Sequence, residues 1–228
     1  MSNSTDNKTN KNNMNICYIV GAGDLHEAKF EFTNRGLLIA ADGGYKVLKH
    51  AKIAPDFVVG DFDSLKIFPK EVPTEVYSKD KDETDMMIAV NKGFDLGHNI
   101  FVIYGGLGGR FEHSMANIQL LTYIAKKEGR GYLIQGDKII TVLSNDSLLI
   151  NAQDDGYVSV LSLSETANGV TLKGLKYPLN EAKLSNSYPM GVSNEFIGEE
   201  VSIEVKDGTL MVLWSSKNPE YSLFTCSS

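Results

Sequence analysis

The sequence predicts an α/β chain in two parts: an N-terminal Rossmann-like domain with a parallel sheet, and a C-terminal all-β domain built as a β-sandwich. In the first part, apolar runs of strand length alternate with helical patterns, as in a βαβ fold. The runs end in loops rich in Asp and Gly. After about residue 132, short β-type runs separated by Asp, Asn and Gly replace the helical patterns.

Five of the apolar runs are each followed by a loop that contains Asp or Gly, and they cover residues 17–20, 37–41, 57–59, 75–77 and 101–104. Ligands of an open parallel sheet bind at the carboxyl ends of the strands, so we expect these loops to converge on one crevice. Glycine lets backbone N–H groups approach phosphate, and Asp carboxylates suit a hard cation. The pattern therefore predicts a phosphate–magnesium site.

Two helical patterns follow these loops directly. Residues 84–96 have apolar side chains at helical spacing, with Asp82 placed to cap the first turn and Gly97 to end the helix. Residues 111–127 repeat the spacing and end before Gly129. Because a helix N-terminus attracts anions, both helices would turn a positive end toward the crevice.

The strongest local signal in the second part is a hairpin. Residues 201–205 alternate between apolar and polar, residues 206–209 read as a turn, and residues 210–214 form the returning strand, with Trp214 in its core. Further β-type runs cover residues 139–143, 147–150, 157–163 and 169–172.

Composition limits the classes of protein to which the chain can belong. The 228 residues allow one large domain or two small ones, and a net charge of −7 disfavours a broad nucleic-acid surface. Cys17 and Cys226 lie near opposite ends, which makes a disulfide framework improbable and favours a reducing cytosol. No stretch reaches the roughly 18 apolar residues of a membrane span. We expect a cytoplasmic protein with a disordered tail at 1–13, an α/β domain at 14–134 and a β domain at 135–228.

Carboxylates gather after neighbouring predicted strands. Asp61 and Asp63 are spaced i and i+2, which puts both on one side of an extended strand end, as a magnesium clamp requires. An isolated pair of this kind is more often a polar turn that caps backbone amides. Asp42 and Asp85 are expected nearby, however, and so many carboxylates without a cation would repel one another.

A charged run at residues 79–85 offers two readings. Lys81 could contact phosphate, and Asp85, expected one turn inside its helix, could contact the metal. A charged run of this kind more often forms a solvent-exposed loop before a helix, and in that interpretation Asp82 caps the helix.

Residues 105–110 (GGLGGR) are the sharpest motif, because four glycines between a strand and a helix are costly unless the backbone needs positive φ or approaches a ligand. The motif matches neither the Walker A nor the G-x-G-x-x-G pattern. Arg110 suits bidentate phosphate contact, or it could be a surface arginine paired with Glu112. His113 and Asn117 share a helical face and could reach the crevice or serve as structural hydrogen-bonding residues.

Together these motifs resemble the thiamine pyrophosphokinase family. The segments ADGG (41–44), PDFVVGDFDS (55–64), DETD (82–85) and GGLGGRFEH (105–113) stand in the family's order, and GLKYPL (174–179) and GVSNE (191–195) continue it. The resemblance covers nearly everything after Met14. Glu112 stands where the family usually has Asp, which puts only the role of that residue in doubt. Tyr177 stands where some members carry Trp.

The resemblance implies transfer of the pyrophosphoryl group of ATP to the hydroxyl of thiamine, with Mg²⁺ as cofactor and AMP as product. It implies catalytic roles for Asp61, Asp63, Asp85 and Arg110, and metal contacts for Asp42, Asp61, Asp63 and Asp85. Implied ATP contacts are Asp42, Lys81, Thr84, Gly105, Gly106, Gly108, Gly109, Arg110, His113 and Asn117, and implied thiamine contacts are Tyr177, Ser193 and Asn194. The family also implies a homodimer, with thiamine held between the α/β domain of one subunit and the β domain of the other.

Two alternatives stay open at this point. A related diphosphokinase could act on another hydroxymethyl heterocycle, such as a pterin, but Tyr177 and the Ser193-Asn194 pair match the thiamine-side motifs. A catalytically inactive nucleotide- or thiamine-binding regulator is the alternative from another class of protein. The joint presence of Asp61, Asp63, Asp85 and Arg110 argues against it.

Overall fold

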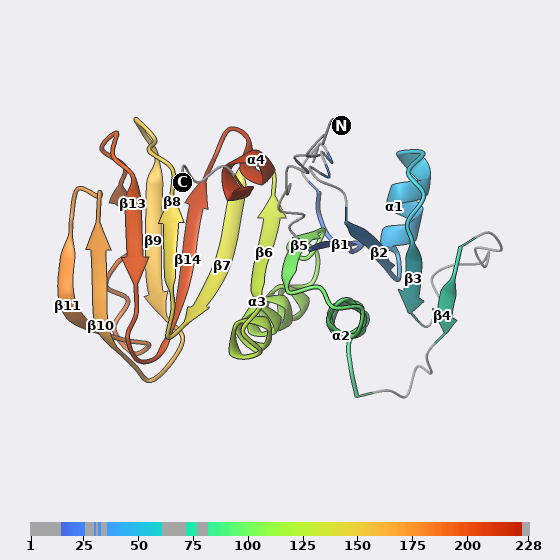
Figure 1. The fold of residues 1–228 in the computed structure, drawn as a ribbon, viewed down its shortest axis with the longest axis horizontal. Coiled ribbons are helices and arrows are strands. Elements are labelled where there is room, and N and C mark those ends of the chain that lie inside the picture. Colours follow the sequence, from blue (N-terminus) through green and yellow to red (C-terminus); the bar gives the residue numbers. More distant parts are fainter. Residues whose placement is uncertain are drawn as a thin grey trace, which may run out of the picture.

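The computed structural model describes residues 15–25, 30, 32, 36–60, 72–76 and 82–224. The expected tail at 1–13 lies outside these described residues, as do Asp61, Asp63 and Lys81. Figure 1 shows a wide sheet that runs from a helix-covered end to an end made of strands alone.

The helix-covered end is built on parallel strands. Their order is β6 (Arg130–Gln135), β5 (Ile100–Tyr104), β1 (Ile16–Val20), β2 (Leu37–Ala41), β3 (Phe57–Gly60) and β4 (Thr74–Val76). All five residues of β1 are buried, which is typical of a parallel strand covered on both faces. Side chains of α2 (Asp85–Asp95) and α3 (Phe111–Lys126) pack on one face, while α1 (Gly44–His50) and α4 (Pro219–Phe224) contribute to the core of the other.

The same sheet continues into the second half of the chain. β6 pairs antiparallel with β7 (Lys138–Ser144), and β14 (Thr209–Ser215), β9 (Tyr157–Ser162) and β12 (Asn194–Glu195) extend it to ten strands. A second, antiparallel sheet has the order β11 (Leu179–Ser185), β10 (Thr166–Lys173), β13 (Val201–Glu204) and β8 (Ser147–Ile150). Its buried side chains, such as Val170 and Ile203, share one core with Val212 and Trp214 of β14.

The predicted C-terminal hairpin is wrong, although both of its strands exist. β13 pairs with β8 and β10, whereas β14 pairs with β7 and β9 in the large sheet. The chain therefore crosses from one sheet to the other at residues 205–208. Alternating buried residues and an Asp-Gly turn arise equally when two strands face each other across a core, so the local pattern could not separate the two arrangements.

The first turn of α2 also differs from the prediction. Thr84 is the N-cap, and its hydroxyl accepts a hydrogen bond from the backbone N–H of Met87 at 3.2 Å. The assignment of Asp82 as the cap is thus wrong, and Asp85 is the first helical residue instead of lying one turn inside. At this position its carboxylate complements the positive end of the helix.

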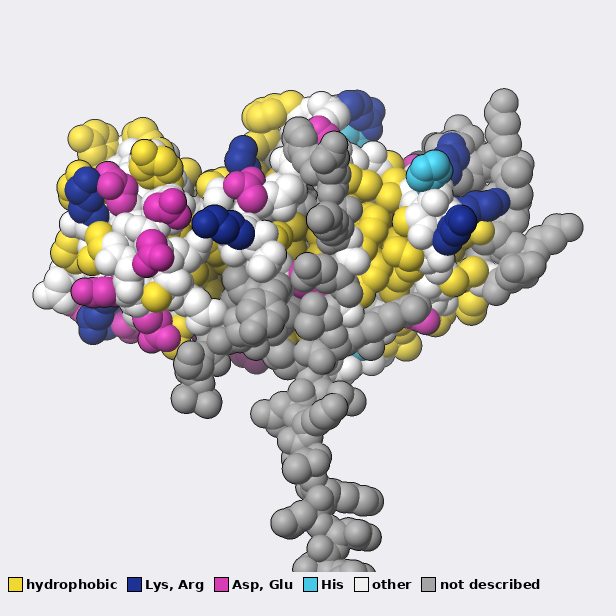
Figure 2. All heavy atoms as spheres, turned by 90° about the horizontal axis from the view of Figure 1, so that it is seen from above, with side chains coloured by type: hydrophobic (Ala, Val, Ile, Leu, Met, Phe, Trp, Pro, Cys, Tyr) yellow, Lys and Arg dark blue, Asp and Glu magenta, His cyan; other side chains and the backbone are white. Residues whose placement is uncertain are grey.

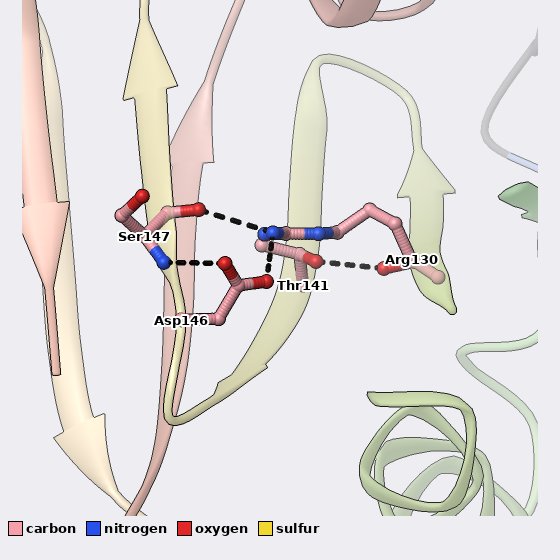
Figure 3. Close-up of polar contacts among 5 residues, drawn as sticks. Arg130, Thr141, Asp146 and Ser147 are labelled. Carbon is pink, nitrogen blue, oxygen red and sulfur yellow. Dashed lines mark hydrogen bonds and ion pairs between the residues drawn. The ribbon is translucent and has the colours of Figure 1, made fainter. Parts of the chain in front are cut away.

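Side-chain hydrogen bonds reinforce the join between the parallel and antiparallel strands (Figure 3). Arg130, at the start of β6, reaches Asp146 and the carbonyl of Ser147 at 2.5 and 3.0 Å. On β7, the buried hydroxyl of Thr141 donates to the carbonyl of Gly131 at 2.7 Å. The turn after β7 is therefore tied directly to the last parallel strand.

Charge is spread unevenly over the face shown in Figure 2. Asp and Glu side chains gather over the strand-rich end, whereas Lys and His side chains lie over the opposite end, where α1 is found. Within the described ranges, no helix is both long and apolar enough to cross a bilayer.

Candidate active site

A pocket of about 410 Å³ lies at the carboxyl ends of β1, β2 and β5, where the N-terminal ends of α2 and α3 also meet. The crevice expected from the sequence is therefore present. It brings together every ATP-side candidate within the described residues: Asp42, Thr84, Asp85, Gly105, Gly106, Gly108, Gly109, Arg110, His113 and Asn117. The remaining candidates, Asp61, Asp63 and Lys81, fall outside the described residues.

Two loops form the centre of the pocket, one after β1 and one after β5. Gly21 donates its N–H to the carbonyl of Tyr104 at 2.8 Å, and Gly23 donates to Gly105 at 2.9 Å. A Cβ on Gly23 would lie 2.5 Å from the carbonyl oxygen of Gly105, so only glycine allows this approach. The chain passes from β1 to β2, β3 and β4 on one side and continues with β5 and β6 on the other side of β1, and an open parallel sheet usually binds its ligand where the strand order reverses in this way.

The glycines of the GGLGGR motif meet different requirements. Gly105, Gly108 and Gly109 adopt φ of +63°, +78° and +66°, which glycine tolerates best. A Cβ on Gly108 would also lie 2.6 Å from the Cβ of Asp24, whereas one on Gly109 would meet open space. Gly106 has an ordinary φ, but a Cβ there would clash with Leu133 at 2.5 Å. The loop is thus shaped by backbone conformation at three positions and by packing at the fourth.

α3 is fixed to this loop by Asn117. Its buried side-chain amide donates to the carbonyl of Gly106 at 2.6 Å, while the residue also lines the pocket. Both of the readings considered for Asn117 therefore hold at once. His113, one turn earlier on the same face, also lines the pocket.

Arg110 lies at the mouth of the pocket and pairs with Glu112, with 3.3 Å between Nε and Oε1. The side chains are 71% and 69% exposed, and an ion pair in water contributes little. The guanidinium can therefore exchange this partner for a phosphate at small cost, so the two readings of Arg110 are compatible.

Carboxylates enter the pocket from two elements. Asp42, between β2 and α1, has a φ of +44°, and Asp85 begins α2. Glu83 also lines the pocket, although sequence reasoning gave it no role. Oxygen ligands of this type fit Mg²⁺. Within the ranges that the structure describes, no three His, Cys, Asp or Glu side chains are grouped closely enough to hold a metal, and two of the four predicted ligands lie outside those ranges.

The thiamine-side candidates lie together, but away from the pocket. The Asn194 side chain, only 5% exposed, accepts from the N–H of Tyr177 at 3.0 Å and donates to its carbonyl at 2.7 Å. Ser193, with a φ of +57°, donates its N–H to the hydroxyl of Ser159 at 3.1 Å. The ring of Tyr177 is 58% exposed. None of the three candidates lines the pocket at the carboxyl ends of β1, β2 and β5 of the same chain.

Exposed apolar side chains accompany them on the strand-rich end. Tyr157, Tyr188 and Val192 are 63%, 70% and 54% exposed. β12 pairs with β9 at the edge of the ten-stranded sheet, and Tyr157 is paired with Glu195 there. Apolar side chains are therefore exposed on this half of the chain.

Comparison with known proteins gives a consistent result. Residues 29–133 match the thiamin pyrophosphokinase catalytic domain, and residues 147–210 match the thiamin pyrophosphokinase vitamin B1 binding domain. A thiamine pyrophosphokinase of Bacillus subtilis is 31% identical over 187 residues, covering 79% of this chain and 87% of the relative.

Crystal structures agree with the sequence relatives. The thiamine pyrophosphokinase structure from Bacillus subtilis superposes with a TM-score of 0.78 at 26% identity, covering 89% of this chain and all of the other. The one from Geobacillus thermodenitrificans gives 0.77 at 28% identity, covering 88% and 97%. Both domain matches, the curated relative and the folds lead to one conclusion: the chain belongs to the thiamine pyrophosphokinase family.

Proposed function

We propose that the protein transfers the pyrophosphoryl group of ATP to the hydroxyl of thiamine, giving thiamine diphosphate and AMP. The observation that carries this proposal is the convergence of glycine loops, two helix N-termini, carboxylates and Arg110 on one pocket in a chain of this family. That combination matches a polyphosphate and its counter-charges.

The chemistry requires positioning and charge neutralisation more than a strong base. The loops after β1 and β5 and the start of α3 bind the phosphates, and Arg110 stabilises the charge that develops on them. The thiamine hydroxyl attacks the β-phosphorus, the bond from that phosphorus to the oxygen shared with the α-phosphate breaks as AMP leaves, and the proton of the hydroxyl is released to solvent.

Mg²⁺ is the proposed cofactor, held by Asp42, Asp61, Asp63 and Asp85. When bound, it neutralises charge on the phosphate oxygens. The positions of Asp42 and Asp85 in the pocket support this assignment, as does the sequence, in which Asp61 directly follows the last residue of β3 and Asp63 comes two residues later. The end of β3 also lies close to Asp42, because a Cβ on Gly60 would be 3.1 Å from the Cα of Asp42. This closeness supports the assignment of the metal ligands.

Thiamine is proposed to bind between two subunits of a homodimer. Tyr177 would lie against the cationic thiazolium, with Ser193 and Asn194 forming the adjoining wall. The exposure of Tyr177, its separation from the phosphate pocket of its own chain and the exposed apolar side chains around β9 support a shared site.

The domain division is part of the same proposal. A Rossmann-like nucleotide domain at 14–134 is followed by a β-sandwich domain at 135–228, and the core shared by the two sheets supports the sandwich. Use of ATP and the separated cysteines favour a cytoplasmic location.

An assay of AMP release from ATP, with and without thiamine, tests the function. We expect release that depends on both thiamine and Mg²⁺, and none when a hydroxymethyl pterin replaces thiamine. Thiamine-independent nucleotide binding without AMP release would indicate the regulator instead.

Subunit complementation tests the shared site. Tyr177→Ala and Asp85→Asn proteins, each nearly inactive at low thiamine, should regain activity when mixed, because a heterodimer has one site with both lesions and one with neither. Absence of recovery after verified subunit exchange would place the whole site within one chain.

A further inference from the structure

The C-terminal helix α4 places a glutamate inside the protein. Glu220 is 1% exposed, and its carboxyl group accepts hydrogen bonds from the hydroxyl of Tyr18 at 2.8 Å and that of Tyr104 at 2.5 Å. It also accepts from the backbone N–H of Phe32 at 3.2 Å. All three groups donate, as an acceptor-only carboxylate requires.

The two tyrosines belong to the central strands of the nucleotide site. Tyr18 lies in β1, and Tyr104 is the last residue of β5, directly before the GGLGGR loop. The rings of Phe30 and Phe32 pack edge-on against Tyr104 and Tyr18, with centroids 5.3 and 5.1 Å apart. Burial, followed by the charge of Glu220, raises the pKa of the Tyr18 phenol far above its usual range, which keeps it a donor.

The backbone of Tyr104 leads from this cluster into the pocket. Its carbonyl accepts from Gly21, and the next bonds join Gly23 to Gly105 and Asp24 to Leu107 at 2.9 Å each. Glu220 thus joins the middle of β1 to the end of β5 on the face opposite α2 and α3, while the loops that follow these strands are hydrogen-bonded to each other at the ligand site.

We propose that Glu220 is a positioning residue for the nucleotide, acting through Tyr18 and Tyr104 to fix the spacing of the loops after β1 and β5. The proposal rests on the proposed function, because it assigns the nucleotide to these loops. Glu220 lies outside both matched family domains, the second of which ends at residue 210.

Three variants test it. Tyr104→Phe removes the hydroxyl that donates to Glu220 and keeps the ring, Glu220→Gln keeps a carbonyl acceptor, and Glu220→Ala removes the carboxyl group together with every bond that it makes. Val170→Ala is the control, because it removes buried atoms from the second sheet, none of whose residues lines the nucleotide pocket. Each protein is examined by thermal melts, by titration with Mg²⁺ and the α,β-methylene analogue of ATP, in which the bond that the proposed reaction breaks is replaced, and by KM for each substrate.

We expect Glu220→Ala to raise the Kd of the analogue and the KM for ATP by about tenfold, because small misplacements of binding groups are costly. Tyr104→Phe should raise both by about threefold, Glu220→Gln should fall between the two, and the KM for thiamine should stay within about twofold in all three. Val170→Ala should lower Tm without changing the Kd.

If Glu220 contributes only to the stability of the fold, a different result is expected. Tm would fall as in Val170→Ala while the nucleotide Kd stayed at the wild-type value, and this outcome overturns the proposal. If Glu220→Ala does not fold, Tyr104→Phe decides by the same criterion. Wild-type protein that binds the analogue but forms no AMP from ATP and thiamine would refute the proposed reaction and leave the Kd comparison decisive, whereas wild-type protein that binds no nucleotide would refute both.

Discussion

Asn194 holds the backbone of Tyr177 at both of its polar groups, accepting from the N–H and donating to the carbonyl. The two residues are 17 positions apart, and the pairing fixes the peptide that carries an exposed aromatic ring. An amide side chain is needed here, because the carboxylate of Asp could accept but not donate.

Changing Asn194 to Asp is therefore expected to impair thiamine binding selectively. The new carboxylate would face the carbonyl of Tyr177, and the KM for thiamine should rise roughly tenfold or more, as we expect for Tyr177→Ala. Steady-state kinetics with each substrate varied in turn measures this. An equal rise in the KM for ATP would instead indicate a general loss of structure.

Removing single charges from the pocket should abolish most of the turnover. Asp42→Asn and Asp85→Asn keep volume, and Asn also tolerates the positive φ of Asp42, so the fold should survive. We expect kcat to fall by at least about 100-fold in each, and likewise in Asp61→Asn and Asp63→Asn. Asp95→Asn, an exposed change at the other end of α2, should have near-normal activity. If one of these variants is as active as Asp95→Asn, the residue changed in it is not a metal ligand.

Glycine substitutions can separate backbone strain from contact with the pocket. Gly97 and Gly109 have φ of +83° and +66°, and a Cβ at either meets open space, so alanine should cost each a similar strain of about 1 kcal/mol. Only Gly109 lines the pocket, so Gly109→Ala should raise the KM for ATP while Gly97→Ala should not. Gly108→Ala should weaken ATP binding more than either, because of its clash with Asp24. Equal KM values in the three variants would mean that the glycines serve only the fold.

Stability should decline in mild alkali because of Cys17. Burial, with a smaller contribution from the charge of Asp56, raises the pKa of this thiol far above its usual range. The unfolded thiol ionises near pH 8.5 while the native one stays protonated, so the free energy of unfolding should fall above that pH by up to about 1.4 kcal/mol per pH unit. Denaturant titrations of wild-type and Cys17→Ala protein between pH 7.5 and 9.5 measure the slope. An identical slope in the variant would show that Cys17 ionises as readily in the native state.

β1, β2, β3 and β5 were predictable because each is a short apolar run next to Asp or Gly, whereas β6, which begins with Arg130 and ends with Gln135, was not predicted. Residues 37–41 were assigned correctly to the residue, and β5 begins one residue earlier than expected. The described ATP-side candidates also met as predicted, since strand direction alone sends their loops to one edge.

Other features depend on partners far away in the chain. β13 and β14 have the residues of a hairpin and pair elsewhere, because their facing sheets satisfy the same alternation. The close approach that requires Gly23 is a property of two loops 82 residues apart, although a Gly-Ala-Gly sequence after β1 was a visible signal. Glu220 carried no signal, since it is a single glutamate whose tyrosine partners lie 116 and 202 residues away.

The pairing of β6 with β7 has a mechanical consequence. Four residue pairs, from Tyr132 with Thr141 to Gln135 with Lys138, join the two halves by a continuous ladder in place of a flexible linker. A hinge rotation between the two halves would have to break the hydrogen bonds between β6 and β7. The two halves are therefore expected to move together as one rigid body. Motions that admit substrate and release product must then occur in loops or between the subunits of the proposed homodimer, and the chain should melt in a single cooperative transition.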